Sequence, residues 1–360
     1  MLVVRGAIKD YDWGIIDGLA PWAGEHTGGP QAELWFGVHP GGPSPLVDAD
    51  GDETGEVLAD KFDIAAIPLL VKILAAARPL SVQVHPQLAV AAAGWRAQQV
   101  PGARRVLSDP FEKTEMLIAL KPFEAFAGWR DREQVVAVLK ELTGAQEAIA
   151  RLMADDLGGA IGALLAIGTN ERISALEAAT REAGLPAAEV AAYSTVAENY
   201  PNDPGALVSV LLDYLSLAAG EAVYVPAGVP HSYIRGIGLE VMTSSDNVIR
   251  LGLTSKPVFV DRAVEALCPD LDPQIVRSVY GDILWPVNSP FVVRMLTEGS
   301  ERIPMGAYRI LLLIEGTARV VSDAAEITLR PGTAAVMAAD DPDAHVEADG
   351  LVAIVQSTER

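Results

Sequence analysis

Thiols are nearly absent from the sequence, which contains one cysteine, Cys268, among its 360 residues. An intramolecular disulfide is therefore impossible, and so is a metal site built from three or four thiolates. A chain without disulfides fits a reducing compartment, so we expect a cytoplasmic protein. The first residues, "MLVVRGAIKDYDWG", also lack the apolar core that a signal peptide requires.

Positive charge is scarce as well, with 27 lysines and arginines against 48 acidic residues and a net charge of −21. Nucleic acid is not an expected partner, because binding its phosphates needs a clustered cationic surface. The longest apolar runs, in residues 67–80 and 205–220, are interrupted by Lys72, Arg78 or Asp213 before they reach the ~20 residues of a membrane span. We therefore expect no membrane association. An anionic ligand would need specific cationic side chains to hold it.

The pattern of apolar, Gly and Pro residues changes twice along the chain, which predicts three domains. Short segments punctuated by Gly and Pro fill the N-terminal third and return after Leu217, whereas Val135, Val138 and Leu142 recur at helical spacing. We expect a mainly β protein with a helical insertion. The expected parts are a catalytic domain of residues 1–130 and 216–265, a helical domain of residues 131–215, and a C-terminal β-domain of residues 266–360.

Histidines number only five, and two of them lie in distinctive surroundings. In "SVQVHP" (81–86), Gln83 and His85 are two residues apart, so their side chains leave a strand on the same face. In "GEAVYVPAGVPHSY" (220–233), the spacing of Gly220, Pro226 and His231 resembles the second signature of the cupin β-barrels, where a Pro/Gly turn directs a histidine into the barrel. Residues 332–340 echo this stretch without its proline and histidine, which indicates a second, degenerate cupin-like barrel.

The first cupin signature normally supplies two histidines and a glutamate. Here "QVH" takes the place of the two histidines, and "EKTEM" (112–116) supplies a carboxylate. Two imidazoles, a carboxylate and an amide oxygen suit a divalent ion, with Zn2+ as the first candidate and Mn2+, Fe2+ or Co2+ admissible. The sequence therefore predicts one metal site per chain, with the ligands Gln83, His85, Glu115 and His231.

Longer stretches of the sequence resemble the type I phosphomannose isomerases, which interconvert mannose 6-phosphate and fructose 6-phosphate. They include "YDWG" (11–14), "SVQVHP" (81–86), "EKTEMLIALKPFEAFAGWR" (112–130), "PAGVPHSY" (226–233) and "LEVMTSSDNVIRLGLTSKPVFVD" (239–261). The resemblance implies a zinc enzyme that acts on a small sugar phosphate. It also implies a cupin catalytic domain, a helical domain and a C-terminal β-domain. Besides the metal ligands, it implies active-site positions at Lys72, Ser81, Lys113, Tyr233, Glu240, Asp246, Arg250 and Lys256.

An aldose–ketose isomerase moves a proton between C1 and C2, which requires a base and stabilisation of the charge that develops on oxygen. Glu240, on the strand after His231, is the expected base, and Arg250 is expected to assist at the enediolate. Asp246 is expected to orient Arg250 or a sugar hydroxyl, and Tyr233 to close one wall. The side chains expected to bind the phosphate are Lys72, Ser81 and Lys256, with Lys113 or Arg250 in support.

Two other functions stay open from the sequence alone, namely an iron-dependent cupin oxygenase and a non-catalytic sugar-phosphate-binding module. An oxygenase needs two histidines and one carboxylate with open positions for O2, so the additional Gln83 argues against it. We expect a monomer or a weak homodimer. Among the other side chains, His39 is expected to brace a turn. Trp13 and Trp35 are expected to pack in the core, with lining of the sugar cleft as the alternative.

Overall fold

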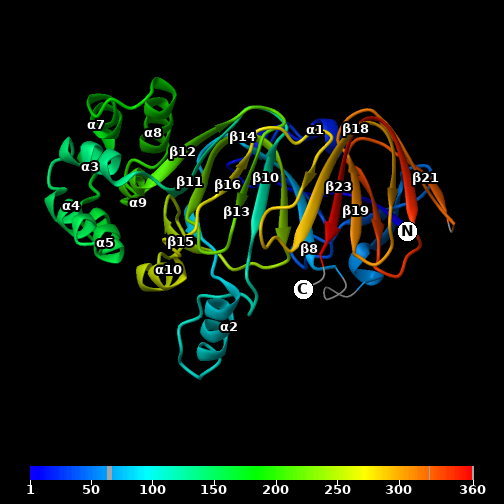
Figure 1. Cartoon of the computed structure of the whole chain (residues 1–360), viewed down its shortest axis with the longest axis horizontal. Helices are drawn as coiled ribbons and strands as arrows, with labels where there is room; N and C mark the ends of the chain where they lie inside the picture. The colour runs from blue at the N-terminus through cyan, green and yellow to red at the C-terminus, as the bar shows by residue number, and fades with distance from the viewer. Residues whose placement is uncertain (63–66, 324, 359–360) are drawn as a thin grey trace.

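The computed structural model describes residues 1–62, 67–323 and 325–358. Three parts follow one another along its longest axis: a group of helices, a central β-barrel and a second β-sheet (Figure 1). The expectation of a mainly β fold with a helical insertion is confirmed. Among the described residues, no helix has the length and apolar character needed to cross a bilayer.

The central barrel is an antiparallel sheet with the strand order β16-β13-β10-β14-β8-β5-β2, to which β9, β11, β12 and β15 are joined through β14 and its neighbours. Strand β8 is buried along its whole length, which explains its nearly unbroken apolar run "LLVKILAA". The strands are β2 (Ala7–Lys9), β5 (Glu33–Phe36), β8 (Leu69–Ala76), β9 (Val82–Val84), β10 (Glu115–Ala119), β11 (Phe123–Trp129), β12 (Leu212–Leu217), β13 (Ala222–Val225), β14 (His231–Thr243), β15 (Ile249–Gly252) and β16 (Gln274–Val276).

Strand β14 connects the two halves of the barrel because its ends pair with different strands. Its beginning pairs with β9 and β11, and its end pairs with β8 and β10. The strand bends at Gly236, where φ is 134° and where a Cβ atom would lie 2.6 Å from Phe123. Only glycine fits this bend without strain. The bend lets one strand carry His231 at one end and Glu240 at the other.

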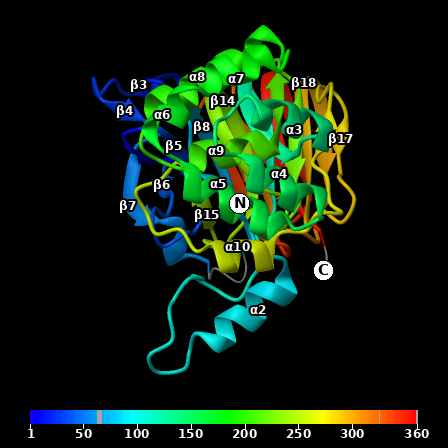
Figure 2. The ribbon, with the colours of Figure 1, turned by 90° about the vertical axis from the view of Figure 1, so that its left-hand side faces the viewer.

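The helical part runs from α3, which begins at Arg132, to the 3-10 helix η2, which ends at Leu211. Asp131 caps the first helix by accepting hydrogen bonds from the N–H groups of Glu133 and Gln134, and Val135 and Val138 face the core. The helices cover one end of the barrel (Figure 2). The block ends earlier than residue 215, because β12 begins at Leu212 and pairs with β11. Its helices are α3 (Arg132–Lys140), α4 (Gln146–Met153), α5 (Leu157–Ile167), α6 (Asn170–Ser174), α7 (Leu176–Glu182), α8 (Ala187–Asn199), α9 (Gly205–Val208) and the 3-10 helix η2 (Ser209–Leu211).

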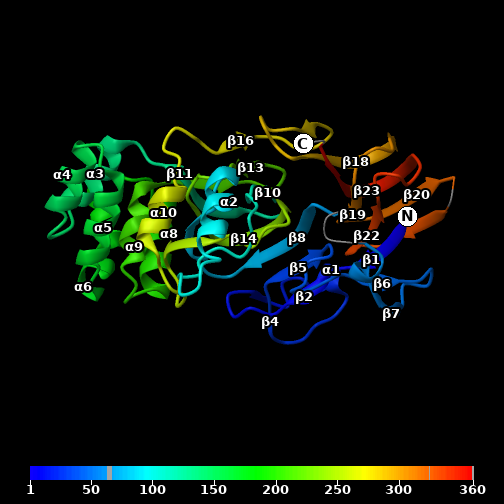
Figure 3. The same ribbon diagram turned by 90° about the horizontal axis from the view of Figure 1, so that it is seen from below.

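The second sheet contains strands from both ends of the chain (Figure 3). N-terminal β1 pairs along its whole length with C-terminal β22, from Leu2 opposite Val336 to Arg5 opposite Thr333. The strands are β1 (Leu2–Arg5), β6 (Pro45–Val47), β7 (Glu53–Val57), β17 (Ile283–Leu284), β18 (Phe291–Ile303), β19 (Arg309–Leu313), β20 (Thr317–Ser322), β21 (Glu326–Leu329), β22 (Thr333–Met337) and β23 (Ala344–Ser357). The remaining strands, β3 (Ile15–Ile16) and β4 (Pro30–Gln31), form a separate pair.

The domain boundaries expected from the sequence are therefore too simple. Strands β1, β6 and β7 belong to the second sheet although they lie within residues 1–130, and β16 pairs with β13 of the barrel although it lies after residue 265. One apolar core contains Val4, Ile73 and Ile310, so it spans both sheets. The physical reason is that strands far apart in sequence complete each other's hydrogen bonds, which composition along the chain cannot reveal.

Outside the helical part, the helices of the described residues are α1 (Ala20–Ala23), α2 (Leu88–Ala97), α10 (Val260–Ala266) and the 3-10 helix η1 (Leu58–Asp60). Helix α2 belongs to an excursion, residues 87–112, that leaves the barrel after β9 and returns at β10. It projects from the body of the protein (Figures 1 and 2). The Gly- and Pro-punctuated sequence of residues 1–130 predicted β-structure in this region and did not predict α2.

Candidate active site

Strand register brings the expected metal ligands together from distant parts of the chain. Gln83 of β9 lies opposite His231 on one side and opposite Arg250 on the other. Side chains at paired positions share a face, so these three project together. Glu115, the first residue of β10, pairs with Val225 and Met242. The barrel thus gathers residues that are up to 148 positions apart.

His85, Glu115 and His231 form a compact buried group whose ligand atoms all lie within 4.8 Å of one another. The Nε2 atom of His85 lies 3.3 Å from Glu115 Oε1, and the Nε2 atom of His231 lies 3.1 Å from Glu115 Oε2. Each of the three residues is no more than 1 % exposed. These close contacts are not hydrogen bonds for His85 Nε2 and Glu115 Oε2, and both atoms lack a hydrogen-bond partner within the described part of the chain. Buried polar atoms without partners are costly, so this donor set fits a metal ion.

Contacts on the far side of each imidazole explain why both Nε2 atoms face Glu115. The Nδ1 atom of His85 is 2.6 Å from the backbone oxygen of Asn247, and that of His231 is 3.3 Å from the oxygen of Val229. When Nδ1 carries the proton and donates it to a carbonyl, Nε2 keeps its lone pair for a metal ion. The two histidines therefore have the orientation that metal ligation requires.

Electrostatics keep these groups in the protonation states of metal ligands. Burial, assisted by the Lys113 ammonium, lowers the pKa of His85 to about 4, so this imidazole is neutral at pH 7. Burial alone would raise the pKa of Glu115, but Lys113 and the two histidines outweigh it and hold that pKa well below its usual range. Lys113 Nζ lies 2.8 Å from Glu115 Oε1. Glu115 is therefore a carboxylate at neutral pH.

Gln83 completes the group from its edge. Its Nε2 atom lies 3.1 Å from His231 Nε2, and its Oε1 atom accepts a hydrogen bond of 3.2 Å from Ser81. A half-turn of the amide exchanges its oxygen and nitrogen, which would direct the oxygen to the side where the imidazole lies. Gln83 is thus close enough to His231 to serve as a fourth ligand.

A cavity of about 590 Å³ opens beside this group. The expected site residues that line it come from both the metal group and the substrate set: Lys72, Ser81, Gln83, Lys113, Glu115, Tyr233, Glu240, Asp246, Arg250 and Lys256. His85 and His231 do not line the cavity and lie buried next to Glu115. The structure therefore brings all twelve expected residues to one place.

A buried ion cluster forms part of the cavity wall. Lys72 Nζ lies 3.0 Å from Glu240 Oε2 and 3.5 Å from Glu33 Oε1, and the indole N–H of Trp35 donates to Glu33. Burial alone would lower the pKa of Lys72, but Glu240 and Glu33 outweigh it and raise that pKa, so the lysine is cationic. Burial raises the pKa of Glu240 despite the nearby Lys72. Sequence reasoning missed Glu33, which looks like an ordinary strand residue in "AELWFG".

Further residues of the wall were not assigned to the site from the sequence. Trp13 and Trp35 pack against apolar clusters as expected, and they also line the cavity, which was the alternative. Asn199 and Tyr200 at the end of α8 line it as well. The helical block thus contributes to the site although it contains no recognisable motif.

His39 braces its turn as expected, since its Nδ1 accepts from the N–H of Gly41. Its Nε2 also lies 2.9 Å from Asp246, which lowers the pKa of that carboxyl.

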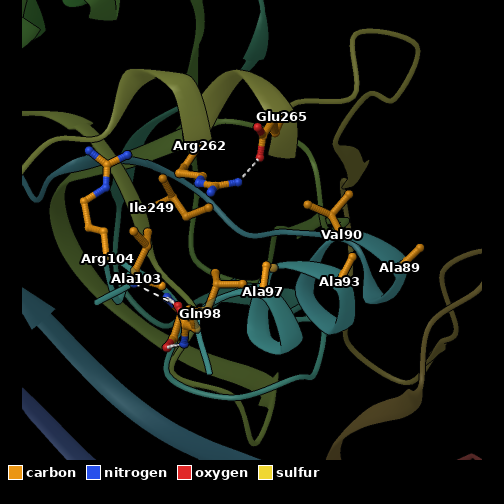
Figure 4. Close-up of a pocket in the computed structure, with 13 residues that line it drawn as sticks. Ala89, Val90, Ala93, Ala97, Gln98, Ala103, Arg104, Ile249, Arg262 and Glu265 are labelled. Carbon is orange, nitrogen blue, oxygen red and sulfur yellow. Dashed lines mark hydrogen bonds and ion pairs between the residues drawn. The ribbon is translucent and has the colours of Figure 1, made fainter. Parts of the chain in front are cut away.

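A second cavity of about 580 Å³ lies between α2 and α10. Figure 4 shows Arg262 and Glu265 of α10 facing Val90 and the alanines of α2. Its charged groups are paired, with Arg262 2.6 Å from Glu265. The amide nitrogen of Gln98 donates to the backbone oxygen of Leu107, and its amide oxygen accepts from the N–H groups of Val106 and Leu107. No unpartnered buried polar atom lines this cavity in the described residues, so it lacks the features of the metal group.

Fold and site together define a metal-binding β-barrel enzyme of the cupin class, with a His–Glu–His group beside a polar cavity. Comparison with known proteins identifies the family. Residues 1–132 match the model of the phosphomannose isomerase type I catalytic domain. The chain is 30% identical to mannose-6-phosphate isomerase of Escherichia coli over 97% of both chains. It is 29% identical to the Homo sapiens protein of the same name over 73% of this chain and 70% of the relative.

Solved structures agree with these relatives. A mutant of phosphomannose isomerase from Salmonella typhimurium superposes over the full length of both chains with a TM-score of 0.86 and 28% identity. A mannose 6-phosphate isomerase bound with zinc and yttrium gives a TM-score of 0.81, again at 28% identity and full coverage. The chain belongs to the mannose-6-phosphate isomerase family, a cupin fold, as its sequence predicted. The comparisons give no support to an oxygenase or a non-catalytic binding module.

Proposed function

We propose that the protein interconverts mannose 6-phosphate and fructose 6-phosphate through a cis-enediol. Family membership supports this activity. The observation that carries it is the buried His85–Glu115–His231 group at the side of a cavity lined by both carboxylates and cations. A cavity of about 590 Å³ lies within the usual size range of small-molecule sites.

We propose that Gln83, His85, Glu115 and His231 hold one Zn2+ per chain, with other divalent ions as possible substitutes. A divalent cation held there supplies Lewis acidity toward the sugar oxygens at C1 and C2. The unpartnered Nε2 of His85 and Oε2 of Glu115 support this ligand set. Lys113, 2.8 Å from Glu115, orients the carboxylate and donates a hydrogen bond to it.

Glu240 is our proposed base for the proton that moves between C1 and C2. Its side chain lines the cavity, and burial raises its pKa, which brings the carboxyl closer to the range where it exchanges protons at neutral pH. Lys72 is held between Glu240 and Glu33 and is only 6 % exposed, which does not favour its expected role at the phosphate. We assign it instead to orienting Glu240.

The phosphate is expected to bind to cationic side chains of the cavity that form no ion pair with a carboxylate. Arg250 lines the cavity without an ion-pair partner in the described chain, and it remains charged at neutral pH although burial lowers its pKa. Lys256 is exposed at the same cavity. We propose that Arg250 serves the phosphate or the enediolate, and that Lys256 and Ser81 bind the phosphate.

Two polar groups are proposed to orient the sugar. The hydroxyl of Tyr233 is buried at the cavity and has no hydrogen-bond partner among the described residues, so it can donate to a sugar oxygen. Asp246, held by His39, can accept from a sugar hydroxyl. We further propose a cytoplasmic protein that acts as a monomer or weak homodimer without nucleic acid or membrane partners.

The test is a coupled assay of fructose 6-phosphate formation from mannose 6-phosphate, run on purified protein together with elemental analysis. We expect about one equivalent of zinc, loss of turnover after chelation, and recovery when Zn2+ is returned. Turnover that survives complete removal of the metal would contradict the proposed metal centre. Metal binding without any sugar-phosphate turnover would contradict the isomerase.

A further inference from the structure

One backbone oxygen aligns His85, and it lies in an irregular segment. The Nδ1 atom of His85 is 2.6 Å from the carbonyl oxygen of Asn247. Residues 244–248 connect β14 to β15 and belong to no strand. The position of this oxygen is therefore not determined by a sheet ladder, and other contacts must hold it in place.

Those contacts come from the side chain of Asn247 itself, which is fully buried. Its Oδ1 accepts from the N–H groups of Ser108 at 2.8 Å and Asp109 at 3.3 Å. Its Nδ2 donates to the backbone oxygens of Asp109 at 2.9 Å and Phe111 at 2.7 Å, and to Asp109 Oδ1 at 3.0 Å. The Asn247 amide thus provides hydrogen-bond partners for backbone N–H and C=O groups of the last residues of the excursion, just before the chain enters β10.

Asp109 makes the reciprocal contacts. Its carboxylate accepts from the hydroxyl of Ser245 at 2.9 Å and from the N–H of Asp246 at 2.9 Å. Two short irregular segments, residues 108–111 and 245–247, are therefore locked together by side chains from both sides. We call this set of contacts the Asp109–Asn247 clasp. Neither residue is a metal ligand, and neither lines the cavity beside the metal group.

We propose that Asn247 is a positioning residue for the metal centre, which it serves by holding the carbonyl that orients His85. The inference rests on the proposed function in so far as that function includes a bound metal ion. Groups that hydrogen-bond the far nitrogen of a ligating histidine determine both its tautomer and the direction of its lone pair. The clasp also gives the excursion a role. Residues 108–111 of the excursion anchor the segment whose carbonyl oxygen forms the hydrogen bond with His85.

The experiment compares Asn247→Ala with Gln98→Ala, in the full-length protein. Gln98 is a matched control because its buried amide also forms hydrogen bonds within the excursion, to Val106 and Leu107, whereas none of its hydrogen bonds among the described residues goes to residues 245–247. The measurement is the dissociation constant for Zn2+ by competition with a chromophoric chelator. The visible spectrum of the Co2+-substituted protein is recorded alongside it, because that spectrum responds to ligand geometry.

We expect Asn247→Ala to weaken Zn2+ binding by about 10- to 100-fold and to change the Co2+ spectrum. Gln98→Ala should leave both unchanged even if it lowers the melting temperature. Asn247→Ser keeps a hydroxyl that can donate or accept a hydrogen bond and adds no charge beside Asp109, so it serves if the alanine variant does not fold. We expect it to weaken Zn2+ binding less than alanine would.

Three outcomes would count against the clasp. Zn2+ affinity and a Co2+ spectrum equal to those of the wild type in both Asn247 variants would overturn it and leave the proposed function intact. Equal losses in the Asn247 and Gln98 variants would mean that general loosening of the excursion, rather than the clasp, weakens the site. A wild-type protein that binds no divalent cation would contradict the proposed metal centre, and the clasp with it.

Discussion

Replacing Glu240 with glutamine tests the proposed chemistry most directly. The substitution keeps the shape of the side chain and removes its ability to accept a proton. A positioned general base contributes about 10²- to 10⁴-fold to a rate. We therefore expect kcat to fall by about that factor, equivalent to about 3–5 kcal/mol in the activation free energy. Zinc content should not change, because Glu240 is not part of the group formed by His85, Glu115 and His231.

The same substitution has a smaller cost in stability, which the structure allows us to bound. Lys72 loses the carboxylate at 3.0 Å but keeps Glu33 at 3.5 Å, so the buried ammonium is not left alone. Removing one partner of a charged hydrogen bond then costs about 1–3 kcal/mol of unfolding free energy. Urea unfolding of both proteins, each loaded with zinc, measures this difference separately from the kinetics.

Glu124→Gln is the matched control, because Glu124 is also a barrel carboxylate in an ion pair, with Arg235, but lies outside the cavity. Its kcat should equal that of the wild type. Full turnover of Glu240→Gln would refute the assignment of the base. A parallel loss of zinc and kcat in that variant would instead show that Glu240 acts by supporting the metal group.

Two further predictions follow from buried groups. The pKa of His85 is lowered to about 4 in the folded protein, so between pH 6.5 and 4 the unfolded chain binds the additional proton. The metal-free protein should therefore lose about 3 kcal/mol of stability as pH falls through this window, and thermal melts of wild type and His85→Gln should show a smaller loss in the variant. Arg309 is fully buried and donates to the carbonyls of Pro304, Ala338, Asp341 and Pro342. Arg309→Leu should lower the unfolding free energy by about 3–5 kcal/mol in urea while kcat at a permissive temperature stays unchanged, and a kcat loss without destabilisation would contradict this reasoning.

Much of the candidate site was predictable because its signals are local. The alternation in "SVQVHP" places Gln83 and His85 on one face, and the Pro/Gly turn before His231 directs that side chain into the barrel. Helical spacing of Val135 and Val138 likewise predicted the helical block. These patterns depend on residues a few positions apart, so the sequence by itself determined the ligand types, the fold class and the helical insertion.

Tertiary structure alone decided which residues share the cavity and how the parts join. Glu33 reaches the site only because β5 pairs with β8, which sets Lys72 beside it and opposite Glu240. Tyr200 and the clasp residue Asn247 act through contacts with segments more than a hundred positions away. Strand register and chain crossings create such contacts, and the free energy that selects them comes from burying the whole core. No short stretch of sequence contains that information.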